Sequence, residues 1–119
     1  MADLRKSDGT VVATDVEMAD TVLKKTVGVM FRRHLPPGFA MIFDMGRDMR
    51  ANIAIHMVFV LVSIDVIYLD GRRTIVDIKH NLRPWIGMAI PKKPARYAIE
   101  MAAGSAVKHG LKNGDTLTW

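Results

Sequence analysis

Residues 53–69 constrain the fold more than any other part of this chain, because they concentrate β-branched side chains. The β-branched residues of this stretch include Ile55, Val58, Val60, Val62, Ile64, Val66 and Ile67. Such side chains favour strands, and Ser63 marks a bend, so the stretch predicts two strands. Its longest apolar run, residues 57–62, is too short to cross a bilayer, which takes about 20 residues.

Further strands are expected on both sides of this stretch. Tyr97, Ile99 and Met101 alternate with the residues between them, which is typical of a strand with two different faces. A turn at Gly71-Arg72 joins two predicted strands into a hairpin. The predicted strands outside residues 53–69 cover residues 10–16, 39–43, 74–79, 96–101 and 115–119.

Two helices are expected between these strands. After Asp20, a suitable N-cap, apolar residues recur at helical spacing until Pro36-Pro37-Gly38 ends the region, which predicts the main helix. A short helix is predicted at residues 102–109. Residues 44–52 are polar and predict a loop, and the prolines of residues 81–94 predict a long irregular connection.

Length and composition bound the architecture. The chain has 119 residues, of which 50% are hydrophobic and 24% charged, and it shows no repeat or linker. We therefore expect a single domain spanning residues 1–119. Short strands together with two helices predict an α+β fold. We expect a strongly curved, barrel-like, mainly antiparallel or mixed β-sheet with one main helix and one short helix.

Cysteine is absent from the sequence. This absence excludes disulfides, thiolate-bound metals and a cysteine nucleophile. Small secreted domains often depend on disulfides, so the composition favours a reducing, cytoplasmic location. The first residues lack the apolar segment of a signal peptide, and an exported precursor trimmed before this chain stays open as an alternative.

Positive charge is concentrated in the second half of the chain. Residues 1–70 carry 8 Lys/Arg and 9 Asp/Glu, whereas residues 71–112 carry 9 Lys/Arg and 2 Asp/Glu. The second segment therefore has a net charge of +7 (9 − 2) within a total of +5. A basic segment can bind an anionic partner such as nucleic acid. No arginine-rich run or aromatic-interleaved motif supports that partner, so a solvated basic face is the favoured interpretation.

Several short motifs follow one another along the chain. A Gly-x-Met-x-Arg segment comes first, and a Gly-led apolar strand, a His-Met pair and an Asp eight residues after that Met follow it. A Glu between two apolar residues, with Gly four residues later, and a closing Gly-x-x-x-Gly-Asp complete the series. These segments are Gly28-Val29-Met30-Phe31-Arg32, Gly38-Phe39-Ala40-Met41-Ile42-Phe43, His56-Met57, Asp65, Ile99-Glu100-Met101-Ala102-Ala103-Gly104 and Gly110-Leu111-Lys112-Asn113-Gly114-Asp115.

In their order and spacing these motifs resemble the proteins grouped as domain of unknown function 192. The resemblance covers roughly residues 18–117. It implies a compact fold of curved β-sheet plus helix, and it supplies neither an established activity nor a location. The chain departs from the family's usual pattern at His56, where the family has Trp, at Val58-Phe59 and at Ser63. A site that the family builds from those positions is therefore altered in this chain.

Asp65 and Glu100 are the leading candidates for chemistry. Both stand in apolar segments, where an ionised carboxylate is costly unless it is paired or hydrogen-bonded. One hypothesis brings Asp65, Glu100 and Arg32 together in a cleft that binds a polar ligand, or in which paired carboxylates perform acid/base chemistry. The favoured alternative is structural, with an arginine fork that clamps one carboxylate and ties the helix to the sheet.

His56 and Trp85 are the other candidate ligand-binding residues. A half-buried histidine at a strand start is the favoured interpretation of His56. Trp85 lies beside Arg83 in the proline-rich connection and is a candidate lid or ligand-stacking residue, with a Trp folded onto the core as the favoured alternative. The four histidines lack metal-ligand spacing, so we expect no metal and no other cofactor.

No motif in the sequence assigns a catalytic residue. The serines lie outside any Gly-x-Ser-x-Gly elbow, and no glycine-rich phosphate loop is present. The leading interpretation is a binding or accessory module that holds a small polar ligand or a protein partner near Arg32, Asp65 and Glu100. A hydrolase with paired carboxylates and a nucleic-acid-binding protein remain alternatives, no membrane association is expected, and both a monomer and a homodimer stay open. Loop methionines predict an adaptable apolar contact surface, and they are Met45, Met49 and Met88.

Overall fold

The centre of the fold is a five-stranded sheet with the strand order β3-β4-β9-β6-β7. The computed structural model describes residues 3–19, 28–30, 32–49, 55–57 and 59–119. β3 and β4 run parallel, and each other neighbouring pair is antiparallel, so the sheet is mixed as the sequence predicted. The strands of this central sheet are β3 (Asp15–Ala19), β4 (Phe39–Met49), β6 (Ile64–Leu69), β7 (Ile75–Leu82) and β9 (Ala95–Ala102).

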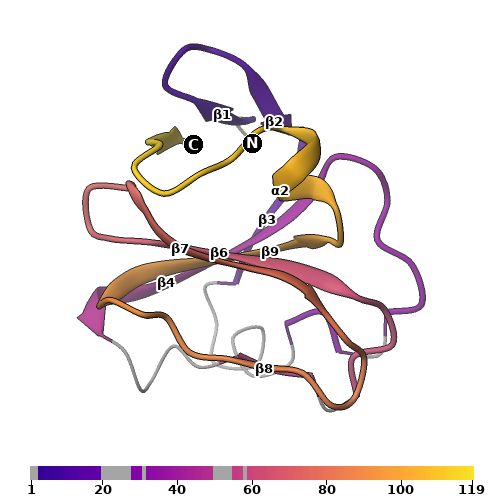
Figure 1. Ribbon diagram of the computed structural model, residues 1–119. Helices are drawn as coiled ribbons and strands as arrows, with labels where there is room; N and C mark the ends of the chain where they lie inside the picture. Colours follow the sequence, from indigo (N-terminus) through magenta and orange to yellow (C-terminus); the bar gives the residue numbers. More distant parts are fainter. Residues whose placement is uncertain (1–2, 20–27, 31, 50–54, 58) are drawn as a thin grey trace.

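Two smaller sheets lie on opposite sides of the central sheet (Figure 1). The upper sheet in this view has the order β10-β1-β2, and the lower one pairs β5 with β8. The short helix α2 lies on the upper side, next to the upper sheet. The bounds of these elements are β1 (Leu4–Lys6), β2 (Val11–Ala13), β5 (Ile55–His56), β8 (Met88–Ala89), α2 (Ser105–Lys108) and β10 (Leu117–Thr118).

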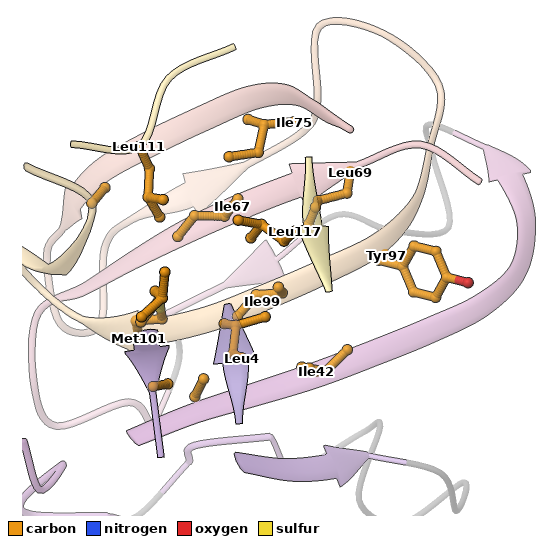
Figure 2. Packing of buried hydrophobic residues seen from close by; sticks show 14 of the residues in the cluster. Leu4, Ile42, Ile67, Leu69, Ile75, Tyr97, Ile99, Met101, Leu111 and Leu117 are labelled. Atoms are coloured by element: carbon orange, nitrogen blue, oxygen red, sulfur yellow. The ribbon is translucent and has the colours of Figure 1, made fainter. Parts of the chain in front are cut away.

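A hydrophobic core fills each side of the central sheet. We call them the upper core, between the central sheet and the β10-β1-β2 sheet, and the lower core, on the side of β8. Figure 2 shows the upper core, where Leu4 and Leu117 pack against Ile99 of β9. The lower core contains Tyr68 and Phe43 from the central sheet and Ala89 from β8. All six residues of β6 are buried, because this strand lies between two neighbours and is covered on both faces.

The predicted barrel-like closure is not found. Closure requires the two edge strands of a sheet to pair with each other, and among the described residues the edge strands β3 and β7 have no such pairing. The flanking strands instead form separate small sheets that cover the two faces. The described part of the chain is mostly β-structure with very little helix.

The two predicted helices have different outcomes. The main helix predicted from Asp20 falls largely outside the described residues, and residues 28–30, which are described, form a turn. The predicted short helix is confirmed as α2, which is shorter than residues 102–109. Strand β9 continues through Ala102, and Gly104 then takes a left-handed conformation with φ of 91°, so helical geometry begins only at Ser105.

Strand β4 is longer than predicted. The polar residues 44–49 were expected in a loop, but they continue β4 beyond its buried half. The guanidinium of Arg96 on β9 donates to both carboxylate oxygens of Asp44, at 2.9 and 3.1 Å, and so joins the two strands across this extension. The register shifts between Asp44 and Met49, and Gly46 has a φ of 84°, which marks the irregularity. The loop was predicted because residues 44–49 lack the apolar alternation of a half-buried strand. The ion pair between Asp44 and Arg96 joins the two strands here without that alternation.

The hairpin of β6 and β7 is confirmed at the predicted turn. Asp70 Oδ1 accepts hydrogen bonds from the backbone N–H groups of Arg72 and Thr74, which closes the turn around Gly71. Of the two strands predicted within residues 53–69, the second is confirmed as β6, which begins at Ile64. The first is limited to β5, because residues 57 and 59–63 are not in a strand. The predicted strand at residues 10–16 is divided at Thr14, because the N–H groups of Thr14 and Asp15 both donate to the carbonyl of Gly38.

Candidate functional site

Asp65 is buried on β6 and is saturated by backbone donors. Its Oδ1 accepts a hydrogen bond from the N–H of Asn81 at 2.9 Å. Its Oδ2 accepts from Gly104 at 3.1 Å and from Ala106 at 3.0 Å. A carboxylate with three backbone donors is satisfied without a cation. Asp65 therefore ties β6 to the end of β7 and to the first residues of α2.

Glu100 lies on the opposite face of the central sheet from Asp65. In the register of β6 and β9, Glu100 is opposite Val66, whereas Asp65 is opposite Met101. Met101 belongs to the upper core and Val66 to the lower core, and successive residues of a strand point to opposite faces. The two carboxylates therefore do not share a cleft, and the paired-carboxylate chemistry that the sequence left open has no geometric basis in the described residues.

The Glu100 carboxylate is held in an apolar site against the turn at Gly28. Among the described residues, its Oε1 is buried and has no hydrogen-bond partner. A Cβ atom at Gly28 would lie 3.0 Å from this oxygen and 3.1 Å from the ring of Phe43, and Gly28 has a φ of 53°. Burial raises the pKa of Glu100 to about 7, against the lowering effects of a hydrogen bond from the Val29 N–H and of the Arg32 charge.

Arg32 clamps a carboxylate that the sequence did not single out. Its Nη1 and Nη2 donate to the two carboxylate oxygens of Glu17 on β3, at 2.7 and 3.3 Å. The guanidinium also lies 5.1 Å from the ring centroid of Phe39. The predicted arginine fork thus exists, with Glu17 in place of Asp65 or Glu100. No spacing in the sequence could have revealed Glu17, because the contact joins a strand to a turn across the fold.

Trp85 is exposed rather than folded onto the core. Half of its surface is accessible, and its ring meets that of Phe59 edge to face, with 5.2 Å between centroids. His56 lies in β5, where it pairs with Met88 of β8, and its side chain falls outside the described residues. The candidate ligand-binding residues are therefore not brought together: Asp65 and Glu100 lie on opposite faces of the central sheet, and Trp85 lies in the connection between β7 and β8.

An exposed apolar surface surrounds Trp85. Ile86 and Met88 are 77% and 67% exposed, and Ile90 is also exposed, whereas Ala89 between them is buried. The segment thus alternates, with every outward position apolar, although the solvent side of such a segment is normally polar. This surface, which we call the Trp85 surface, consists of Phe59, Trp85, Ile86, Met88 and Ile90.

The backbone holds this surface in a defined shape. The N–H of Met57 donates to the carbonyl of Gly87 at 3.0 Å, and the N–H of Trp85 donates to the carbonyl of Met57 at 2.9 Å. A Cβ atom at Gly87 would lie 2.8 Å from the Met57 side chain, so only glycine permits this close approach. Phe59 and Trp85 both have positive φ, at 62° and 69°, which L-residues rarely adopt without support from surrounding structure. The apolar side chains are thus presented by pinned backbone.

The exposed charges next to the Trp85 surface are positive. Arg83, Lys92 and Lys93 are exposed, and residues 83–94 contain no acidic side chain. Asp77 approaches this segment, and it is buried and bound to Lys79 Nζ at 2.9 Å and to the N–H of Lys92 at 3.0 Å. The surface therefore combines apolar side chains with a basic rim.

Comparison with known proteins supplies a family. The model of DUF192, described as "Uncharacterized ACR", matches residues 4–119. The chain belongs to the DUF192 family. The resemblance that the motif series indicated is thereby confirmed, and it extends over nearly the whole chain.

Relatives of this DUF192 protein are named as UPF0127 proteins. One from Pyrococcus abyssi is 42% identical over 104 residues, covering 87% of this chain and 85% of the relative. One from Thermococcus sibiricus is 37% identical over 116 residues, covering 98% of this chain and 73% of the relative. Neither name states an activity.

Two solved structures resemble the fold of the DUF192 protein. A protein of unknown function from Novosphingobium aromaticivorans has a TM-score of 0.84 at 24% identity, over 98% of this chain and 82% of that chain. A putative transcription regulator from Sinorhizobium meliloti has a TM-score of 0.85 at 25% identity, over 98% of this chain and 89% of that chain. The likeness supports the fold described above.

Within the residues that the structure describes, no group of three or more His, Cys, Asp or Glu side chains is placed to hold a metal ion. None of the helices in the same part of the chain combines the length and apolarity that a bilayer crossing requires.

Replacing Asp65 tests its role as a backbone acceptor. Asp65→Ala leaves the N–H groups of Asn81, Gly104 and Ala106 without their acceptor, and a buried unsatisfied group costs about 1–3 kcal/mol. We predict a loss of about 3 kcal/mol or more in the free energy of unfolding, measured by urea denaturation. Asp3→Ala, at a partly exposed surface ion pair, is the control and should change the free energy by less than about 0.5 kcal/mol.

Glu100 makes stability depend on pH. Its pKa is raised from 4.5 to about 7 by folding, so the unfolded chain loses the proton first as pH rises. The free energy of unfolding is therefore highest below about pH 4.5 and falls as pH rises to the folded-state pKa of about 7. The total decrease is about 3 kcal/mol. Glu100→Gln cannot ionise, so this variant should not show the decrease. Urea denaturation should find that the difference in free energy of unfolding, variant minus wild type, grows by about 3 kcal/mol between pH 4.5 and pH 8.

Glu17→Gln is the matched control, because Glu17 is the other glutamate of the chain and is partly exposed. This variant should keep the decline in stability between pH 4.5 and pH 8. An equal decline in wild type and Glu100→Gln would show that Glu100 ionises normally in the folded protein.

Proposed function

We propose that this DUF192 protein is an accessory module that docks on a protein partner through the Trp85 surface. The observation that carries the proposal is the outward apolar row of Ile86, Met88 and Ile90 beside the exposed Trp85. Contiguous exposed apolar side chains rimmed by polar groups are characteristic of interaction sites. Tryptophan in particular supplies a large share of binding energy where it becomes buried at an interface.

The basic rim specifies the kind of partner. Arg83, Lys92 and Lys93 would face the partner around the apolar centre, so the partner is expected to carry Asp or Glu around an apolar patch. Two copies of this chain would bring like charges together at the same surface, which opposes a symmetric homodimer through it.

A small polar ligand bound jointly by Arg32, Asp65 and Glu100 is a weaker candidate. Arg32 and Asp65 are occupied by partners within the protein, and Asp65 and Glu100 point to opposite faces. Nucleic-acid binding through residues 71–112 is supported by their net charge of +7 (9 − 2) alone. The description "putative transcription regulator" belongs to the Sinorhizobium meliloti protein. These alternatives define outcomes of the experiment below.

Site-specific photocrosslinking tests the proposal. Ile86→p-benzoylphenylalanine places a photoreactive group on the Trp85 surface, and Val107→p-benzoylphenylalanine places it on α2, which is also highly exposed. Both proteins are irradiated in extract of the source organism, and adducts are identified by mass spectrometry. We predict a discrete protein adduct from position 86 alone, with its crosslinked peptide next to Asp or Glu residues.

The purified partner then allows affinity to be measured. Trp85→Ala should weaken binding by about 2 kcal/mol, or about 30-fold, whereas Val107→Ala should leave it unchanged. An adduct of the chain with itself, an adduct with nucleic acid alone, or equal adducts from positions 86 and 107 would contradict the proposal.

A further inference from the structure

A cavity lies beside the corner where β9 leads into α2, and it shares no lining residue with the Trp85 surface. Its volume is about 320 Å³, and it is lined by residues 34–39, by Val12 and by the corner where β9 leads into α2. Figure 1 shows α2 on the upper side, opposite β8. The volume is at the lower end of the range for small-molecule sites. The cavity is therefore separate from the surface proposed above for a protein partner.

The cavity is lined by buried apolar side chains and by titratable side chains that are all basic. Val12, Leu35, Phe39 and Met101 are buried residues that contribute apolar lining. The titratable side chains among the lining residues are His34, Lys108 and His109, and none of the lining residues is Asp or Glu. A site of this composition favours a ligand that has both an apolar part and a negative charge.

Two acidic residues near the cavity are engaged by other groups. Asp65 lies behind the corner of β9 and α2, where it binds the N–H groups of Gly104 and Ala106. Asp115 lies 4.0 Å from Lys6 and 3.3 Å from Lys112 in ion pairs. Asp65 and Asp115 are thus bound to other groups, whereas Asp15 is opposite Phe39 in the register of β3 and β4 and acts on the charge of Arg32. Lys108 is exposed in the last turn of α2.

His109 lies in the same positively charged environment. Its pKa is lowered by burial first and then by the charges of Lys108 and Lys6. Lys6 Nζ also donates to the backbone carbonyl of His109 at 3.5 Å, which places a second cation beside the cavity. A neutral imidazole next to two ammonium groups is suited to donate a hydrogen bond to an anion without adding charge.

We propose that this cavity binds a small organic carboxylate, with its apolar chain against Phe39 and Met101 and its carboxylate near Lys108, His34 and His109. The basic lining selects the charge, and the apolar depth selects a ligand with a short hydrocarbon portion. Binding here is independent of partner docking at the Trp85 surface.

The test uses the purified full chain and a series of linear carboxylates from acetate to octanoate. We expect affinity, measured by isothermal titration calorimetry, to rise with chain length until the cavity is filled, because each buried methylene adds favourable transfer free energy. 1-Hexanol has an apolar chain like that of hexanoate and no charge, so it should bind at least ~10-fold more weakly than hexanoate. Amide chemical-shift changes should cluster at Gly104, Ser105 and His109.

Lys108→Met removes the cation at the cavity and should weaken hexanoate binding at least ~10-fold. Lys93→Met is the matched control, because Lys93 is an exposed lysine of the Trp85 surface rim, and it should leave hexanoate binding unchanged. Absence of binding by every carboxylate at ~10 mM, equal loss in both variants, or shift changes centred on residues 85–90 would overturn the proposal. Photocrosslinking at position 86 should be the same with and without Lys108→Met, so the two proposals fail separately.

Discussion

The buried carboxylate of Asp65 is the interaction on which the arrangement of the outer segments depends. It accepts backbone hydrogen bonds from Asn81 at the end of β7 and from Gly104 and Ala106 at the start of α2. Asn81 stands just before the segment that presents Trp85, and Gly104 lines the cavity beside α2. One side chain on β6 thus positions the approaches to both proposed binding regions. A charge in a core is tolerated here because each of its oxygens has a donor.

Two buried acidic residues of the central sheet, Asp65 and Glu100, show how different the cost of burial can be. Asp65 faces the upper core with saturated oxygens, whereas Glu100 faces the lower core with one oxygen that has no partner among the described residues. Burial of that kind favours the protonated form, which is why the pKa of Glu100 is raised to about 7. Gly28 fits tightly over this carboxyl, so the glycine of the family's Gly-x-Met-x-Arg segment and the glutamate of its later motif meet in space.

The fold separates two kinds of surface. The lower side carries an apolar row with a basic rim on pinned backbone, and a cavity with basic and apolar lining lies beside α2. An accessory module with both would join recognition of a partner to recognition of a small anion, although each stands on its own observations. The relatives and solved structures of the DUF192 family share the sequence or the fold of this chain, and their names leave the activity open.

Local chemistry is what the sequence by itself determined. The second half of the β-branched run, the turn at Gly71-Arg72 and the alternation of residues 96–101 correctly predicted strands and the hairpin, because propensity and turn chemistry act between near neighbours. The first half of that run forms a strand only at Ile55–His56 among its described residues. The motif series correctly indicated the family. The apolar residues 86–90 are equally visible in the sequence, but the sequence does not show which of their side chains face solvent.

Tertiary structure alone decided which groups meet. It paired Arg32 with Glu17 and placed Asp65 and Glu100 on opposite faces of the central sheet. It also extended β4 through the Arg96–Asp44 contact and, among the described residues, left the edge strands β3 and β7 unpaired with each other. Each outcome depends on strand order, register or the packing of distant segments. Those quantities are set by the summed burial and hydrogen bonding of the whole chain, so no single stretch of residues encodes them.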